Sequence, residues 1–160
     1  MTESTVDPAA YRQVLGHFPT GVTVVAGMHE GAPVGMAIGS FFSISLEPAL
    51  VGFCAGGWSS TWPKLREAGN FCVNILAEDQ EHISRVFASK EEDKFAGLGW
   101  DLTALGSPRL TGALAWVDCS LYEVHPEGDH DLVVGEVHDL AVAREGGPLV
   151  FFRGGYGNLS

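Results

Sequence analysis

The segment at residues 33–61, PVGMAIGSFFSISLEPALVGFCAGGWSST, constrains the fold most strongly. Two apolar, strand-like runs flank a bend of small and hydroxyl-bearing residues, and Ser59, Ser60 and Thr61 then open a helix. Small residues let a backbone approach a planar group, and a helix start presents N–H groups and hydroxyls to an anion. The segment therefore predicts a cradle for a flat ligand with a phosphate tail. A bulge or barrel corner followed by an ordinary helix cap is the alternative.

Strand-like segments dominate the rest of the chain, and the helices fall in the interruptions between them. Strands are expected at residues 22–26, 34–45, 49–54, 71–76, 113–124, 131–142 and 149–152, and helices from Asp7-Pro8, over about 60–68 and from Asp79. Residues 87–110 are expected to form loops and short helical turns. This order favours a mainly β fold, a closed antiparallel barrel, over a doubly wound sheet. The Rossmann and P-loop glycine patterns are also absent.

Composition fits one compact domain over residues 1–160, because 160 residues with 46% hydrophobic content can bury a core. Nucleic acid is excluded as a partner by the formal charge of -11, since phosphate binding needs clustered Lys and Arg. The start, MTESTVDPAAYRQ, lacks the basic and apolar regions of a secretory signal. No apolar run approaches the length of a membrane span. We therefore expect a cytoplasmic protein with no membrane segment.

Cysteines and histidines give no metal signature. The three cysteines lie in apolar runs without a C-x-x-C pair, which predicts reduced, structural thiols: Cys54, Cys72 and Cys119. The six histidines match no H-E-x-x-H spacing, so no metal site is predicted. The weaker alternative is a loop site in which His125 and His130 flank Glu127 and Asp129.

Several motifs resemble one family in the same order along the chain. GMAIGSF at 35–41, SISLEP at 43–48 and LVGFC at 50–54 are similar to the core of the short-chain flavin reductases. The resemblance extends to FPTGVTVV at 18–25, FCVNIL at 71–76, DKF at 93–95, GDH at 128–130 and PLVFFRG at 148–154. Family members usually carry Thr at the position of Ala37 and often Ser at that of Gly39. Hydroxyl contacts to a flavin are therefore not expected from these two residues.

The resemblance implies a split β-barrel of Greek-key order with short peripheral helices, which forms a homodimer and binds flavin near the subunit interface. It implies an NAD(P)H:flavin oxidoreductase that transfers a hydride from NADH to FMN or FAD. Reduced flavin would then pass to a partner flavin-dependent monooxygenase. Such chemistry needs stacking, orientation and partial charge rather than a protein nucleophile.

The resemblance also implies roles for individual residues. Flavin-binding positions are Val34, Gly35, Met36, Ala37, Gly39 and Ser40 along the ring, Cys54, Ala55 and Gly56 on the next strand, Ser60 and Thr61 at the phosphate, and Phe87 closing one side. His130, Arg153 and Tyr156 are expected to contact NADH, with His130 as the catalytic residue. The other interpretation of His130 is a hairpin-turn residue, because Gly128 and Asp129 are turn formers.

Two other functions remain open. One is a flavin-binding carrier or sensor without reductase turnover, which the same barrel would serve. The other is a different oxidoreductase that acts on a bound small substrate. Consumption of NADH with free flavin separates a reductase from a carrier, and a product other than reduced flavin would indicate the third function.

Overall fold

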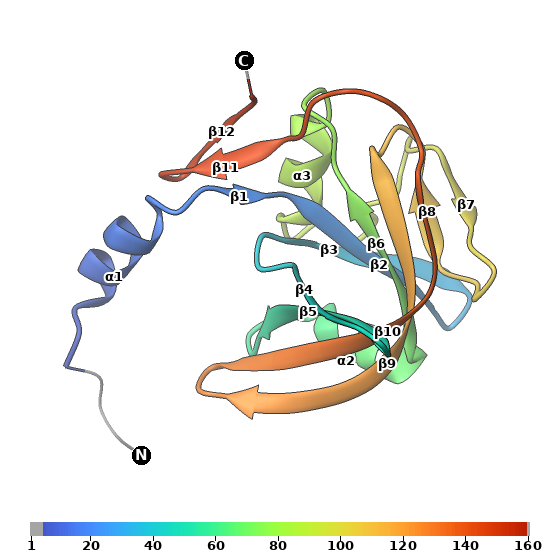
Figure 1. Ribbon diagram of the computed structural model, residues 1–160, viewed down its shortest axis with the longest axis horizontal. Coiled ribbons are helices and arrows are strands. Elements are labelled where there is room, and N and C mark those ends of the chain that lie inside the picture. Colours follow the sequence, from blue (N-terminus) through green and yellow to red (C-terminus); the bar gives the residue numbers. More distant parts are fainter. Residues whose placement is uncertain (1–4, 160) are drawn as a thin grey trace.

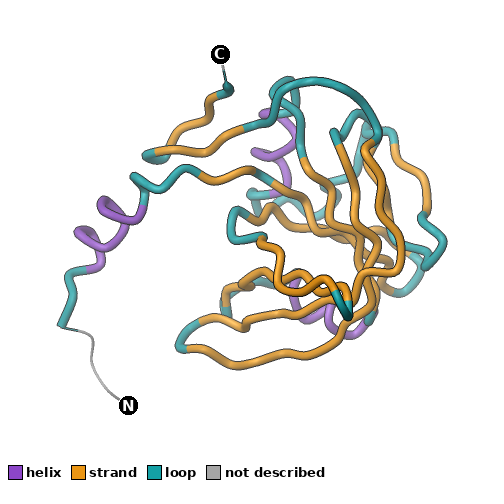
Figure 2. Tube along the Cα trace, in the orientation of Figure 1, coloured by secondary structure: helices purple, strands orange, loops and turns teal. Residues whose placement is uncertain are grey.

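The computed structural model describes residues 5–159, which form a mainly β fold with three short helices. The helices are α1 (Pro8–Leu15), α2 (Trp62–Ala68) and α3 (Glu81–Phe87). The strands are β1 (Thr20–Gly21), β2 (Thr23–His29), β3 (Ala32–Ile38), β4 (Phe42–Leu46), β5 (Ala49–Gly56), β6 (Asn70–Ile75), β7 (Trp100–Leu102), β8 (Pro108–Leu110), β9 (Ala115–Glu127), β10 (His130–Val142), β11 (Val150–Phe152) and β12 (Gly155–Gly157). Figure 2 shows the strands as the body of the molecule and the helices at its periphery.

Seven strands form one antiparallel sheet in the order β3-β2-β6-β9-β10-β5-β4. The two edge strands, β3 and β4, follow each other in the chain across a bend at residues 39–41, so the sheet curls toward itself (Figure 1). Ser40 fixes this bend, because its Oγ accepts from Cys54 N at 2.9 Å and donates to Cys54 O at 3.3 Å. The predicted mainly β, barrel-like fold with short peripheral helices is confirmed.

Both faces of the central strands are buried. Val25, Phe53 and Phe71 belong to a cluster inside the curled sheet. Val24, the neighbour of Val25, belongs to a second cluster on the opposite face, together with Phe87. Strands buried on both faces have continuous apolar sequences rather than alternating ones. This explains the apolar runs that the sequence shows at residues 22–26 and 71–76.

A hairpin of β7 and β8 occupies the segment that was predicted to be loops and helical turns. Its attachment depends on Asn74, a fully buried residue of β6. Asn74 Oδ1 accepts from Leu110 N at 2.8 Å, and its Nδ2 donates to Pro108 O at 3.3 Å and to Val24 O at 3.2 Å. The prediction of loops was wrong here because one distant amide side chain holds these short strands.

The N-terminal helix and the C-terminal hairpin form a separate projection, at the upper left in Figure 1. β1 pairs with β11, and β11 with β12, in a small sheet. Arg153 N donates to Gly16 O at 2.8 Å and so attaches the end of α1 to this sheet. The helix predicted from Asp7 is confirmed, and none of its residues is buried, with Tyr11 59% and Val14 65% exposed. Across residues 5–159, the helices are too short and too polar to cross a membrane.

Candidate active site

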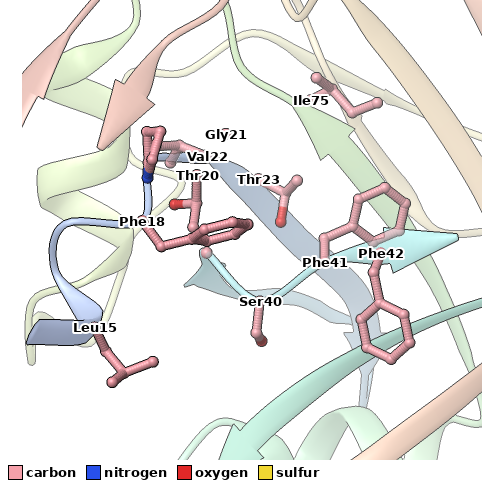
Figure 3. Close-up of a pocket in the computed structure, with 12 residues that line it drawn as sticks. Leu15, Phe18, Thr20, Gly21, Val22, Thr23, Ser40, Phe41, Phe42 and Ile75 are labelled. Carbon is pink, nitrogen blue, oxygen red and sulfur yellow. The ribbon is translucent and has the colours of Figure 1, made fainter. Parts of the chain in front are cut away.

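An open cavity of about 610 Å³ lies between the start of β2 and the β3–β4 bend (Figure 3). Its lining is mostly apolar: Leu15, Phe18, Pro19, Thr20, Gly21, Val22, Thr23, Gly39, Ser40, Phe41, Phe42 and Ile75. Gly39 and Ser40 are exposed and bring two of the predicted flavin positions to the cavity. The bend predicted from residues 33–61 thus does border a concave surface.

The earlier residues of β3 are arranged differently from the prediction. Val34 and Met36 pack against the inner cluster, whereas Ala37 packs against the outer one. Gly35 is buried, and a Cβ added to it would lie 2.8 Å from Cε1 of Phe87. Gly35 is therefore small because a ring from α3 packs on it.

Phe87 was predicted to close one side of the flavin site, but it is only 1% exposed. Its ring meets that of Phe95 edge to face, with centroids 4.9 Å apart, inside the outer cluster. None of Val34, Gly35, Met36, Ala37 and Phe87 lines the cavity. In this structure Phe87 thus packs against Gly35 on the outer face of β3, away from the cavity.

The end of β5 brings the second predicted group to the same bend. Cys54 is bonded through its backbone to Ser40, and Ala55 is fully buried in the inner cluster. Burial raises the pKa of the Cys54 thiol above its ordinary value. Gly56, at the end of the strand, pairs with His130 of β10. The β3–β4 bend, the end of β5 and the β9–β10 turn therefore form one continuous region.

The start of α2 differs from the anion site that the sequence predicted. Ser59 Oγ accepts from Thr61 N at 3.2 Å and from Trp62 N at 3.1 Å. Pro63 has no N–H group. These helix amides are therefore not free to bind a phosphate. Donors remain in the hydroxyls of Ser60, which is exposed, and Thr61, which is half-buried.

His130 lies at the start of β10 and is held by its neighbours. Its Nδ1 lies 2.7 Å from Asp129 Oδ1, and this hydrogen bond lowers the pKa of the Asp129 carboxyl. The Asp129 carbonyl accepts from Gly57 N at 2.9 Å, which joins the β9–β10 turn to the turn after β5. The ring of Trp58 meets the imidazole edge to face at 4.9 Å. Sequence reasoning missed Trp58, although a large aromatic within the small-residue run GGWSS was a visible signal.

Of the other predicted NADH residues, Tyr156 lies on β12 and Arg153 in the turn between β11 and β12. Figure 1 shows this hairpin apart from the start of β10, where His130 lies. The Tyr156 hydroxyl is 2.8 Å from Ser84 Oγ, and the guanidinium of Arg85 lies over the Tyr156 ring at 4.9 Å. Arg153 is exposed, with its guanidinium over Phe152 at 4.6 Å. Within one chain, these two residues and His130 do not form one site.

One group of potential metal ligands occurs among residues 5–159, at a place the sequence did not indicate. The ligand atoms of His29, Glu30 and Glu67 all lie within 4.8 Å of one another. His29 Nε2 already lies 3.1 Å from Glu67 Oε2, and both carboxylates are exposed. The group is explained as an ion pair that fastens the β2–β3 turn to α2. His125, from the weaker alternative, instead faces Glu123 at 3.3 Å.

Comparison with known proteins agrees with this geometry. The sequence profile of the flavin reductase like domain matches residues 15–160. The reductase subunit HsaB of a flavin-dependent monooxygenase from Rhodococcus jostii (strain RHA1) is 49% identical, over 94% of this chain and 77% of that protein. The chain therefore belongs to the flavin reductase like family.

Two solved structures are similar to this chain over nearly its whole length. The structure of nitrilotriacetate monooxygenase component B from Mycobacterium thermoresistibile has a TM-score of 0.93 at 47% identity, covering 95% of this chain and 86% of that one. An NADH:FAD oxidoreductase from Streptomyces globisporus C-1027, solved in complex with NAD and FAD fragments, has a TM-score of 0.89 at 35% identity. That match covers 99% of this chain and 98% of the other.

Proposed function

We propose that this protein is an NAD(P)H:flavin oxidoreductase that reduces FMN or FAD with NADH and supplies reduced flavin to a partner monooxygenase. The observation that carries the proposal is the open cavity beside the β3–β4 bend in a chain of the flavin reductase like family. The same bend is bonded to β5, whose end pairs with His130. The cavity and the imidazole of His130 are thus connected through β5.

The residues present fit a flavin. A volume of about 610 Å³ is within the range of small-molecule pockets, and a mostly apolar lining suits a planar ring. Gly39 keeps the cavity lip open, because an added Cβ would meet Thr20 Oγ1 at 3.3 Å. The hydroxyls of Ser60 and Thr61 are candidate donors to a phosphate. Because the helix amides are already bonded to Ser59, we expect these hydroxyls to contribute more to phosphate binding than the sequence suggested.

Hydride chemistry is supplied by the flavin and the nicotinamide themselves when both are bound. The chain binds and orients them. The 2.7 Å hydrogen bond between Asp129 and Nδ1 of His130 restrains the orientation of the imidazole. No nucleophilic side chain is needed for this reaction.

A homodimer is part of the proposal. The exposed apolar residues of α1 and the loop that follows support it, because Val14 is 65% and Phe18 73% exposed and such a face is usually covered by another surface. A second copy would also allow Arg153 and Tyr156 to approach the His130 of its neighbour. We further propose that residues 1–160 act as one domain in the cytoplasm, where the three free thiols would stay reduced.

The test is stopped-flow reduction of the flavin-loaded protein by NADH, with His130→Ala as the variant. We expect flavin affinity and thermal stability to stay nearly unchanged, since the His130 side chain is 37% exposed and the Asp129 carboxylate, its hydrogen-bond partner, is exposed. The second-order constant for NADH should fall about ten- to a hundredfold, or roughly 1.4 to 2.7 kcal/mol of transition-state stabilisation. His125→Ala, in the same hairpin, is the matched control and should keep the wild-type rate.

A variant that reduces flavin at the wild-type rate but melts several degrees lower would make His130 a turn residue. A protein that binds flavin but consumes no NADH with free FMN or FAD would instead be the carrier or sensor. The proposed reductase activity would then be wrong, whereas the flavin site would stand.

A further inference from the structure

Trp58 is a large, exposed aromatic residue at the edge of the candidate site. It lies in the turn between β5 and α2 and is 74% exposed. Its ring covers Gly56, because a Cβ added there would lie 2.6 Å from Cζ2 of Trp58. The ring also meets His130 edge to face, with centroids 4.9 Å apart and planes at 89°. The fold thus leaves much of an indole surface in solvent beside His130, the proposed catalytic residue.

The turn that carries this ring is held at several points. Gly57 N donates to Asp129 O at 2.9 Å, and Ser59 N donates to Gly56 O at 3.1 Å. Ser59 Oγ then caps Trp62 N at 3.1 Å. These bonds hold the backbone on both sides of Trp58. The indole is therefore presented in a fixed place, which lowers the entropy cost of binding a second ring on it.

The position of Trp58 along the chain indicates which ring that is. One residue separates it from Ser60 and two from Thr61, whose hydroxyls are the proposed donors to the flavin phosphate. FMN ends at that phosphate. A dinucleotide continues beyond it with a second phosphate, a ribose and adenine, so a planar base needs a surface just past the hydroxyls.

We propose that Trp58 is the stacking surface for the adenine of a dinucleotide, FAD or NADH, and thereby a specificity residue; this inference rests on the proposed flavin reductase function. An indole can bind an adenine by stacking without any positive charge on the protein. That suits a chain with a formal net charge of -11, which repels anionic dinucleotides at long range. Every base has a π-face that an exposed indole can accept.

The experiment compares FAD and FMN binding by calorimetry in wild type, Trp58→Leu and Trp58→Phe. In Trp58→Leu we expect the Kd for FAD to rise about tenfold, the scale of one base–aromatic stack, while the Kd for FMN stays the same. Trp58→Phe keeps an aromatic ring and should retain most of the FAD affinity. Circular dichroism melting checks that both variants are folded, which the exposure of Trp58 favours.

A second arm identifies the source of the adenine. With FMN as acceptor, a rise of about tenfold in KM for NADH at unchanged kcat in Trp58→Leu means that NADH supplies the base. A loss confined to the FAD titration means that the flavin supplies it. Either result supports the inference.

Unchanged FAD affinity together with an unchanged KM for NADH would overturn the role of Trp58 and leave the reductase function intact. Equal losses for FMN and FAD would also overturn it, because Trp58 would then contact the part that the two flavins share. If wild-type protein bound neither flavin, the proposed function itself would be wrong.

Discussion

Two glycines, Gly35 in the middle of β3 and Gly39 directly after it, should respond to the same substitution in opposite ways. In Gly35→Ala the new methyl group would lie 2.8 Å from Phe87 Cε1 and 3.3 Å from Val25 O. The Phe87 ring is 1% exposed and packed against Phe95, so it cannot move toward solvent. Overpacking of this kind costs about 1–3 kcal/mol. At about 2–4 °C per kcal/mol for a chain of this size, the melting temperature should fall by roughly 2–12 °C.

Gly39→Ala is the matched control. Gly39 is exposed at the cavity lip, and the nearest atom to an added Cβ is Thr20 Oγ1 at 3.3 Å. The free energy of unfolding should change by no more than about 0.5 kcal/mol, as for most surface substitutions. Flavin affinity should fall, since the methyl group enters the cavity.

Urea unfolding measures the first quantity, and a flavin titration at a temperature where every variant is folded measures the second. We expect Gly35→Ala to lose stability and keep its flavin affinity. Combining Gly35→Ala with Phe87→Leu should show a coupling of about 1 kcal/mol or more, because the smaller side chain relieves the contact. If Gly35→Ala is as stable as wild type but binds flavin weakly, Gly35 borders the ligand after all and our assignment of the two faces of β3 is wrong.

Two further predictions concern the other parts of the site. Ser60→Ala combined with Thr61→Ala should raise the Kd for FMN far more than that for riboflavin, because each lost hydrogen bond to a charged group is worth about 1.5–3 kcal/mol; equal losses would mean that the phosphate lies elsewhere. Burial raises the pKa of Cys54 and so leaves less thiolate at any given pH, so alkylation by iodoacetamide should be slow at pH 7 and accelerate only in alkaline solution. Mass spectrometry should find the buried Cys72, whose pKa is raised to about 12, unmodified in the native protein; rapid modification of Cys54 at neutral pH would contradict this.

Local sequence predicted the strands well where burial is continuous. Residues 71–76 are apolar except for Asn74 because both faces of β6 are covered, and the prediction there differs from β6 by one residue at each end. The β7–β8 hairpin could not be predicted in the same way. Its strands are short and depend on hydrogen bonds from Asn74, which precedes Leu110 by 36 positions in the chain. Local patterns carry no information about such a partner.

The sequence predicted which elements meet at the candidate site. The side-chain directions that it did not predict have one physical origin. The meeting of the bend with β5 was expected, and the bonds between Ser40 and Cys54 show it. The orientation of Gly35 was not expected. The alternation of apolar and polar residues cannot distinguish the two faces of a strand when both faces are buried. The engagement of the helix amides by Ser59 also depends on the three-dimensional turn. Residue types thus predicted which elements meet at the candidate site, whereas side-chain directions required the structure.

The small sheet of β1, β11 and β12 has a consequence for the order in which the molecule forms and opens. β1 and β11, which are far apart in the sequence, pair through only two residue pairs, Thr20 with Phe151 and Gly21 with Val150. Contacts so distant in sequence are costly to close, and so few bonds make a weak cooperative unit. The amide protons of this sheet should therefore exchange with solvent before those of β2 and β6. Since Thr20 and Gly21 line the cavity, this part of its wall should open at a lower free-energy cost than the central sheet.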